Sequence, residues 1–194
     1  MKHDNRPDSL LVQAIADGHL DALEPLVRRH QDGVRRLAYR FLGEWSAADD
    51  VAQDAFLRVV RAAPRYQPTA RFTTWLHRIV VNLCLDSRRR RARFVAADLP
   101  DGPACLPPDV LERDETVRRV RQALNGLPER QRTAVILHRY EGHSHREIAE
   151  VTGWSESAVE SLLVRAYANL RQALAETDGN SARRPPENRP RAVQ

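Results

Sequence analysis

The apolar residues of this chain recur at three- and four-residue intervals, which is the spacing of one buried face of a helix. In residues 23–41 that face is formed by Leu23, Val27, Val34, Leu37, Ala38 and Phe41. No stretch alternates between apolar and polar residues over the length of a strand, and only 8 of the 194 residues are glycine. The pattern therefore predicts an all-α protein.

Positive charge is concentrated in one window of the sequence. Residues 61–93 hold nine arginines and a single acid, Asp86, whereas the net charge of the whole chain is only +5. A basic helix that follows a loop of aromatic residues and prolines is suited to contact a polyanion. The alternative is a solvated helix face, and the asymmetry of the charge favours nucleic acid.

The helix expected from Ser46 onwards has an acidic outer face. Asp49 lies in the predicted first turn, where the helix dipole favours negative charge. These acids either keep the surface soluble or form a docking face for a protein partner that is itself basic. The candidate docking residues are Asp49, Asp50, Gln53 and Asp54.

Pro64 ends that helix, and a loop containing aromatic residues and arginines leads to the next one. Aromatic rings stack on unpaired bases and guanidinium groups hold phosphates, so this combination suits single-stranded nucleic acid. The spacing of Trp75 with Ile79 favours a core position for the indole. Tyr66 and Phe72 are the freer aromatic candidates.

Residues 94–114 contain four prolines among small and acidic residues, which predicts a linker. Helices resume over residues 115–174, and the last two have the pattern of a helix-turn-helix. A capping box at Ser144 opens the first of these helices and Ser155 caps the second. The proline-rich, polar residues 175–194 predict a disordered tail.

In a helix-turn-helix, the second helix enters the major groove of DNA and its first turns contact base edges. Plain three-helix bundles share the pattern, and the charge of the first half of this chain favours DNA binding. The candidate base-contacting residues are Ser144, Ser155, Glu156, Ser157, Glu160, Ser161 and Arg165.

Three stretches of sequence together resemble a bacterial sigma factor of the extracytoplasmic-function (ECF) type. They are ADDVAQDAFLRVV, RFTTWLHRIVVNLCLDSRRR and the stretch from LPERQRTAV to YANLR. The resemblance implies two small helical domains joined by a flexible linker, of which residues 1–93 form the first. It also implies a non-catalytic subunit that binds core RNA polymerase, selects promoters and helps to open the DNA.

The resemblance assigns roles to the candidate residues. The acidic helix corresponds to the segment that docks on the β′ clamp of core RNA polymerase, and the second domain is expected at the β flap. The last helix corresponds to the one that reads the −35 element. Asn82 corresponds to a position near a base flipped out of the non-template strand. The residues expected to recognise and melt the −10 element are Arg65, Tyr66, Arg71, Phe72, Trp75, Arg78, Asn82, Arg88, Arg89, Arg90 and Arg91.

The recognition helix departs from the family pattern. Many ECF members carry basic residues where this chain has Glu160 and Leu162. A glutamate accepts a hydrogen bond from the amino group of cytosine, but it cannot contact a phosphate. We therefore expect the upstream DNA sequence that this chain reads to differ.

Further expectations concern partners and location. The resemblance implies an anti-sigma protein that restrains the chain, and promoter DNA as the nucleic acid. The polar N-terminus and the absence of a long apolar run predict a cytoplasmic protein without membrane insertion. Cys84 and Cys105 are expected to be reduced thiols. No dimer seam is evident, so no obligate homo-oligomer is expected.

Two other classes of function compete with this interpretation. A stand-alone helix-turn-helix regulator would account for residues 128–174 but would leave the acidic helix and the aromatic loop unused. A metalloprotein would need a complete ligand set. His138, His143 and His145 cluster in the sequence, but no cysteine or paired carboxylate completes a set, so exposed loop histidines are expected. We expect no cofactor, no metal and no enzymatic activity.

Overall fold

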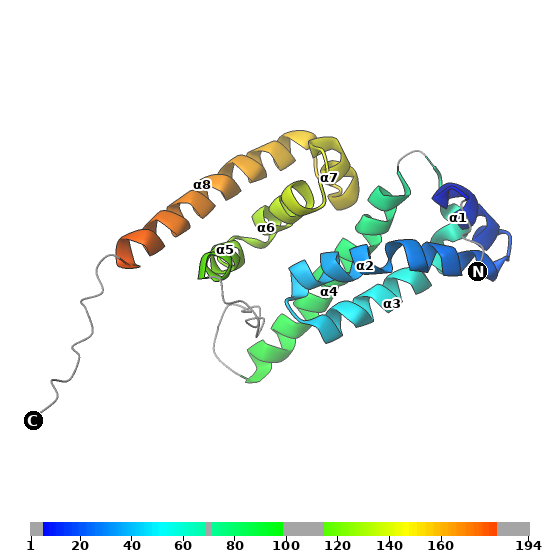
Figure 1. Ribbon diagram of the computed structural model, residues 1–194, viewed down its shortest axis with the longest axis horizontal. Coiled ribbons are helices and arrows are strands. Elements are labelled where there is room, and N and C mark those ends of the chain that lie inside the picture. Colours follow the sequence, from blue (N-terminus) through cyan, green and yellow to red (C-terminus); the bar gives the residue numbers. More distant parts are fainter. Residues whose placement is uncertain (1–5, 69–70, 99–114, 182–194) are drawn as a thin grey trace, which may run out of the picture.

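The computed structural model describes residues 6–68, 71–98 and 115–181, and all regular elements in these ranges are helical (Figure 1). The first module contains α1 (Asp8–Ala16), the 3₁₀ turn η1 (Leu20–Ala22), α2 (Leu23–Leu42), α3 (Trp45–Ala62), the 3₁₀ turn η2 (Ala63–Arg65) and α4 (Phe72–Asp98). The second module contains α5 (Glu115–Asn125), α6 (Glu129–Val135), the π-helical turn η3 (Ile136–Tyr140), α7 (His145–Thr152) and α8 (Glu156–Ser181). The prediction of an all-α fold with two helical domains is confirmed.

The core of the first module lies between α2, α3 and α4. The apolar stripe predicted on α2 is buried from Val34 to Phe41, whereas Leu23 and Val27 are only half-buried. Each fully buried aliphatic side chain stabilises the fold by about 1.5–3 kcal/mol. The fully buried side chains that fill this core are Leu11, Val12, Leu26, Val34, Leu37, Phe41, Val59, Leu76, Val80 and Leu83.

Two helices continue beyond their expected ends. Helix α4 runs to Asp98 and so includes five residues of the expected linker, and α8 runs to Ser181, past the expected start of the tail. Both extensions are free of proline, the residue that most strongly ends a helix, and a single glycine costs only about 1 kcal/mol. Residues 99–114, which include Cys105, and residues 182–194 lie outside the described residues.

The second module contains the predicted helix-turn-helix. The hydroxyl of Ser144 accepts a hydrogen bond from the Glu147 amide at 3.2 Å, and the Glu147 carboxylate accepts one from the Ser144 amide at 2.9 Å. This is the predicted capping box. Gly153 adopts a φ of 75° in the turn, and the Ser155 hydroxyl caps α8 by accepting from the Ala158 amide at 3.2 Å. No helix within the described ranges is long and apolar enough to cross a membrane.

The two modules are in contact, with α4 lying against α7 (Figure 1). Nδ1 of His77 and Nε2 of His143 are 2.8 Å apart across this contact. Arg40 donates to Glu141 at 2.6 Å, and its guanidinium lies over the Tyr140 ring, 5.0 Å from the centroid. His143 is only 7% exposed, so the expectation of exposed loop histidines is wrong for this residue. Its partner lies in another module, which no local pattern reveals.

Burial keeps the histidine pair neutral. It lowers the pKa of His77 from 6.5 to about 4, and the neighbouring His143 and His30 act in the same direction. Burial also lowers the pKa of His143, as does Arg71, although Glu147 opposes this change. One ring must donate to the other, so the hydrogen bond cannot form between two protonated rings.

We predict that mild acidification separates the modules. We call the chain closed when α4 contacts α7, as in this structure, and open when the modules are apart. Because the pKa of His77 and of His143 is lowered in the closed arrangement, the closed arrangement holds fewer protons than the open one. The closed arrangement therefore loses stability as the pH falls below the ordinary histidine pKa, by at most about 1.4 kcal/mol per pH unit for each ring. The radius of gyration from small-angle X-ray scattering should therefore increase between about pH 7.5 and 5.5.

The control is the variant H77N/H143Q, in which neutral amides replace the two ring nitrogens that face each other. Its radius should not respond to pH over this range. The titration stops near pH 5.5 because burial raises the pKa of Glu141, and protonation of that carboxylate would favour the closed arrangement instead. An equal response in the variant and the parent chain would show that the histidine pair is not responsible.

Candidate nucleic-acid interface

The acidic candidates lie on the outer side of α3. Asp50, Gln53 and Asp54 are exposed, and Asp49 is partly buried. The sequence predicted that Asp49 lies in the first turn of this helix. Because α3 begins at Trp45, Asp49 lies in the second turn instead. Its carboxylate accepts hydrogen bonds from Arg35, one of them at 3.2 Å. The free acidic charge of this face therefore resides mainly on Asp50 and Asp54.

An apolar hollow adjoins these acids between α2 and α3, with a volume of about 590 Å³. Leu57 is 54% exposed at its edge, and the half-buried Leu23 and Val27 line it. Sequence periodicity placed these two α2 residues in the core. A face that combines exposed apolar side chains with a charged rim is the usual composition of a protein-binding surface.

The aromatic candidates form one cluster where α4 begins. The centroid of the Tyr66 ring lies 4.8 Å from Trp75 and 6.3 Å from Phe72, and Phe72 lies 5.8 Å from Trp75. Phe72 is 6% exposed and packs against His30, so the expectation that it is a free stacking ring is wrong. Tyr66 and Trp75 are half-buried and keep accessible surface. Phe72 instead packs against these two rings from the buried side of the cluster.

A second hollow, of about 410 Å³, opens beside the aromatic cluster and is lined in part by Tyr66, Arg71 and Thr73. Burial raises the pKa of Tyr66, and its hydroxyl has no hydrogen-bond partner within the described residues. On the exposed side of α4, Arg78 and Asn82 follow Trp75 at helical spacing. The structure therefore brings stacking rings, a polar amide and positive charge to one region.

The four arginines from Arg88 to Arg91 do not share a face, because successive helical residues are about 100° apart. Arg88 is turned toward the second module, where its Nη1 lies 4.0 Å from Glu129, and burial lowers its pKa. Arg89 lies 3.8 Å from Asp86, and Arg90 is exposed. Arg91 pairs with Glu44, whose pKa is lowered by the Ser46 hydroxyl and by this arginine. In the closed arrangement, Arg90 is therefore the most accessible to a phosphate.

The first turns of α8 present a continuous polar surface. Of the predicted residues, Ser144 and Ser155 are used as helix caps, although both remain exposed. Arg165 donates to the Ser161 carbonyl at 3.1 Å, which holds its side chain along the helix. Val159, Leu162, Leu163 and Ala166 are buried, so the opposite face of α8 is turned toward solvent. The exposed candidates on that face are Glu156, Ser157, Glu160, Ser161 and Arg165.

Sequence reasoning missed Val164, which is 66% exposed on α8. It follows Ser157, Glu160 and Ser161 at helical spacing and therefore lies on their face. A valine in the major groove is suited to contact the methyl group of thymine. The signal was present in the spacing, but an apolar residue in a helix is usually assigned to the core.

Two protein-family models match the chain, one in each module. The family model described as Sigma-70 region 2 matches residues 26–94, which include the acidic, aromatic and basic candidates. The model described as Sigma-70, region 4 matches residues 117–170, which include the helix-turn-helix. Both modules of the chain are thus matched.

Curated relatives match most of the chain. The ECF RNA polymerase sigma factor SigE of Mycolicibacterium smegmatis is 38% identical over 165 residues, which are 82% of this chain and 64% of SigE. The ECF RNA polymerase sigma factor SigM of Mycobacterium tuberculosis is 37% identical over 169 residues, which are 87% of this chain and 85% of SigM. The chain thus spans just under two thirds of SigE and most of SigM.

A solved structure of CnrH in complex with the cytosolic domain of CnrY has a TM-score of 0.65 and 31% identity, covering 88% of this chain and 98% of CnrH. A structure of the sigma factor RpoE from Bartonella quintana, with a TM-score of 0.63 and 22% identity, shows the same fold over 78% of this chain and 96% of RpoE. The matched regions and the identity across most of SigM lead to one conclusion: the chain belongs to the family of ECF RNA polymerase sigma factors.

Proposed function

We propose that this chain is a promoter-specificity subunit of RNA polymerase, which docks on the core enzyme through α3 and binds the two promoter elements through α4 and α8. The observation that carries the proposal is the arrangement of the first module. It holds an acidic, partly apolar face on α3 beside a basic helix with accessible aromatic rings. A stand-alone regulator would use neither surface. The action is non-catalytic, and it places the protein in the cytoplasm with the polymerase.

The α3 face is proposed to bind the β′ clamp. Asp50 and Asp54 supply exposed negative charge toward a basic partner, which accelerates association. The neighbouring hollow between α2 and α3 receives apolar side chains of the partner, and Leu57 lies at its edge. The Asp49 carboxylate accepts hydrogen bonds from Arg35, so we assign it to fixing α3 against α2 and not to pairing with the clamp.

The start of α4 is proposed to hold the melted −10 strand. Flipping a base out of the duplex costs a few kcal/mol, and stacking on an aromatic ring returns about 1–3 kcal/mol per base. Tyr66 and Trp75 offer the rings, and Asn82 offers an amide that can hydrogen-bond a base edge. Arg65, Arg71 and Arg78 are exposed near this end of α4, and Arg90 is exposed further along the helix; these arginines are proposed to hold the phosphates.

The first turns of α8 are proposed to read the −35 element. Ser157, Glu160 and Ser161 present hydrogen-bonding groups to base edges, and Val164 presents a methyl surface. Glu160 accepts a hydrogen bond from a cytosine amino group, and it disfavours bases that offer only acceptors at this point. The second module is proposed to rest on the β flap at the same time.

Promoter binding requires the modules to separate. The two promoter elements lie about two turns of DNA apart, and each turn spans about 34–36 Å. The contact of α4 with α7 keeps the two DNA-binding surfaces on one compact body. We therefore propose that the free chain is closed and that binding to core polymerase opens it. CnrH was solved with the cytosolic domain of CnrY, and an anti-sigma protein is the partner proposed to restrain this chain.

We predict that D50A/D54A weakens the binding of core polymerase about tenfold, which corresponds to about 1.4 kcal/mol. Fluorescence anisotropy of labelled chain, titrated with core enzyme at two salt concentrations, would measure it, and the loss should shrink at high salt. The matched control is D17A/D21A, which removes two exposed acids from the same module outside the α3 face. Equal affinities in a folded D50A/D54A and the parent chain would contradict the docking face.

We also predict that Asn82→Ala reduces open-complex formation on duplex promoter DNA about tenfold and changes core binding little. The amide acts only once a base has left the stack, so its loss raises the cost of the melted state. Permanganate footprinting of the −10 region would measure opening. A template with a pre-melted −10 region should restore most of the activity. A normal yield of open complex on duplex DNA would refute the assignment.

A further inference from the structure

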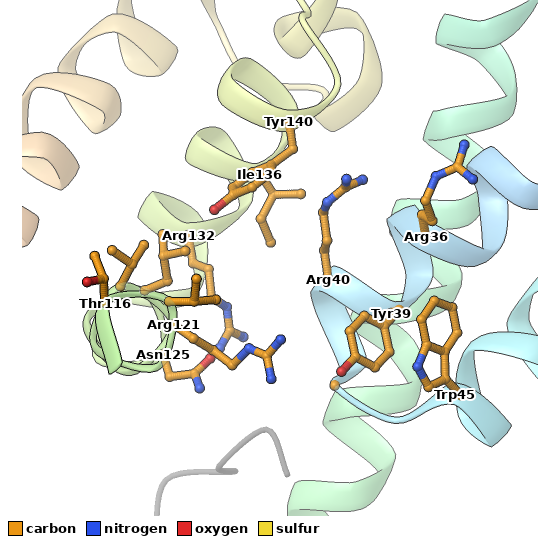
Figure 2. Close-up of a pocket in the computed structure, with 14 residues that line it drawn as sticks. Arg36, Tyr39, Arg40, Trp45, Thr116, Arg121, Asn125, Arg132, Ile136 and Tyr140 are labelled. Carbon is orange, nitrogen blue, oxygen red and sulfur yellow. The ribbon is translucent and has the colours of Figure 1, made fainter. Parts of the chain in front are cut away.

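A cavity of about 520 Å³ lies between the two modules (Figure 2). Tyr39 and Arg40 of α2 approach it from one side, and Arg121 of α5, Arg132 of α6 and Tyr140 of η3 approach it from the other. A volume of this size is typical of sites for small organic molecules. None of the docking and DNA-binding roles proposed above uses this cavity.

Arg132 is the residue that points to a ligand. Its side chain lines the cavity and is only 4% exposed, yet its Nε and Nη2 atoms have no hydrogen-bond partner within the described residues. A buried guanidinium is always charged, and leaving its donors unpaired is strongly unfavourable. An anion in the cavity would remove this penalty by accepting hydrogen bonds from both nitrogens.

The rest of the lining fits an anion with an apolar or aromatic body. The charged side chains among the described lining residues are all arginines, namely Arg36, Arg40, Arg121 and Arg132. The Tyr39 ring stacks on Trp45 at a centroid distance of 4.1 Å, and Ile136 adds apolar surface. Asn125 contributes a buried Oδ1 that lacks a hydrogen-bond partner in the described ranges and can accept from a ligand donor.

We propose that this cavity binds a small organic anion, in which a carboxylate, sulfonate or phosphate group is joined to an aromatic body. The acidic group lies on Arg132, and the ring lies against the Tyr39 side. Because the lining comes from both modules, the ligand binds the closed arrangement more tightly than the open one. Binding therefore shifts the equilibrium between the two arrangements toward the closed one, and the ratio of the two affinities sets the largest possible shift.

The first test is a titration of the full chain with 8-anilino-1-naphthalenesulfonate, an aromatic sulfonate whose fluorescence increases in apolar sites. We expect saturable binding at one site. Arg132→Met, which keeps the length of the side chain without its charge, should weaken this binding at least tenfold. Arg132→Lys should retain part of it, because a lysine keeps the charge but not the fork of donors.

The matched control is Arg139→Met, which removes an exposed arginine of η3 that does not line the cavity. Its affinity for the probe should equal that of the parent chain. Removing an unpaired buried charge relieves a penalty, so Arg132→Met should melt at the same temperature as the parent chain or higher. If Arg132→Met nevertheless fails to fold, Arg36→Met tests the same cavity from α2 and should weaken probe binding about threefold. Equal probe affinity in a folded Arg132 or Arg36 variant would overturn the proposal.

The second test asks whether the ligand closes the chain. At saturating probe, the radius of gyration should stay at its compact value to a pH lower than in the free chain. In Arg132→Met the probe should have no such effect. A probe that binds through Arg132 but leaves the pH dependence unchanged would refute the closing role. Neither test contains polymerase or promoter DNA, so the proposed function and this inference succeed or fail separately.

Discussion

The structure depends on how α4 is buried. Leu76, Val80, Leu83 and Cys84 pack one side of this helix into the core formed with α2 and α3, and this contact fixes the direction of the other side chains of α4. His77 then meets the second module, and Arg78 and Asn82 face solvent. One helix therefore supplies core packing, a contact between modules and the proposed nucleic-acid surface, and a rotation about its axis would disturb all three.

The same packing keeps opposite charges on separate surfaces. Asp50 and Asp54 of α3 and the exposed arginines of α4 belong to neighbouring helices. The pairs that form in this region instead join Asp49 to Arg35 of α2, and Glu44, which precedes α3, to Arg91 of α4. Exposed ion pairs contribute only about 0–1 kcal/mol to stability. Asp50 and Asp54 have no ion-pair partner among the described residues, which therefore costs the fold little and leaves their charge available to a partner protein.

The features that the sequence predicted correctly depend on residues close together in the chain. The capping box at Ser144 and the Ser155 cap each join positions three residues apart. The buried stripe of α2 from Val34 to Phe41 follows from helical periodicity. The features that the sequence did not predict depend on contacts between residues that are far apart in the chain. Phe72 is buried because His30 of another helix packs on it, and His77 meets His143 across 66 positions.

Under the proposed function, the contact between the modules prevents promoter binding by fixing the distance between the two DNA-binding surfaces, not by covering them. Arg78 and Asn82 on α4 stay exposed in it, as do Ser157 and Glu160 on α8. Either surface could meet DNA singly, but two elements about two turns apart cannot be bound by surfaces held on one compact body. Any ligand or protonation that changes the contact between modules must therefore change promoter affinity, and promoter binding must change the affinity for that ligand by the same factor. The histidine pair and the arginine-lined cavity both lie between the modules, so under this proposal each acts on DNA binding by shifting the balance between the closed and open arrangements.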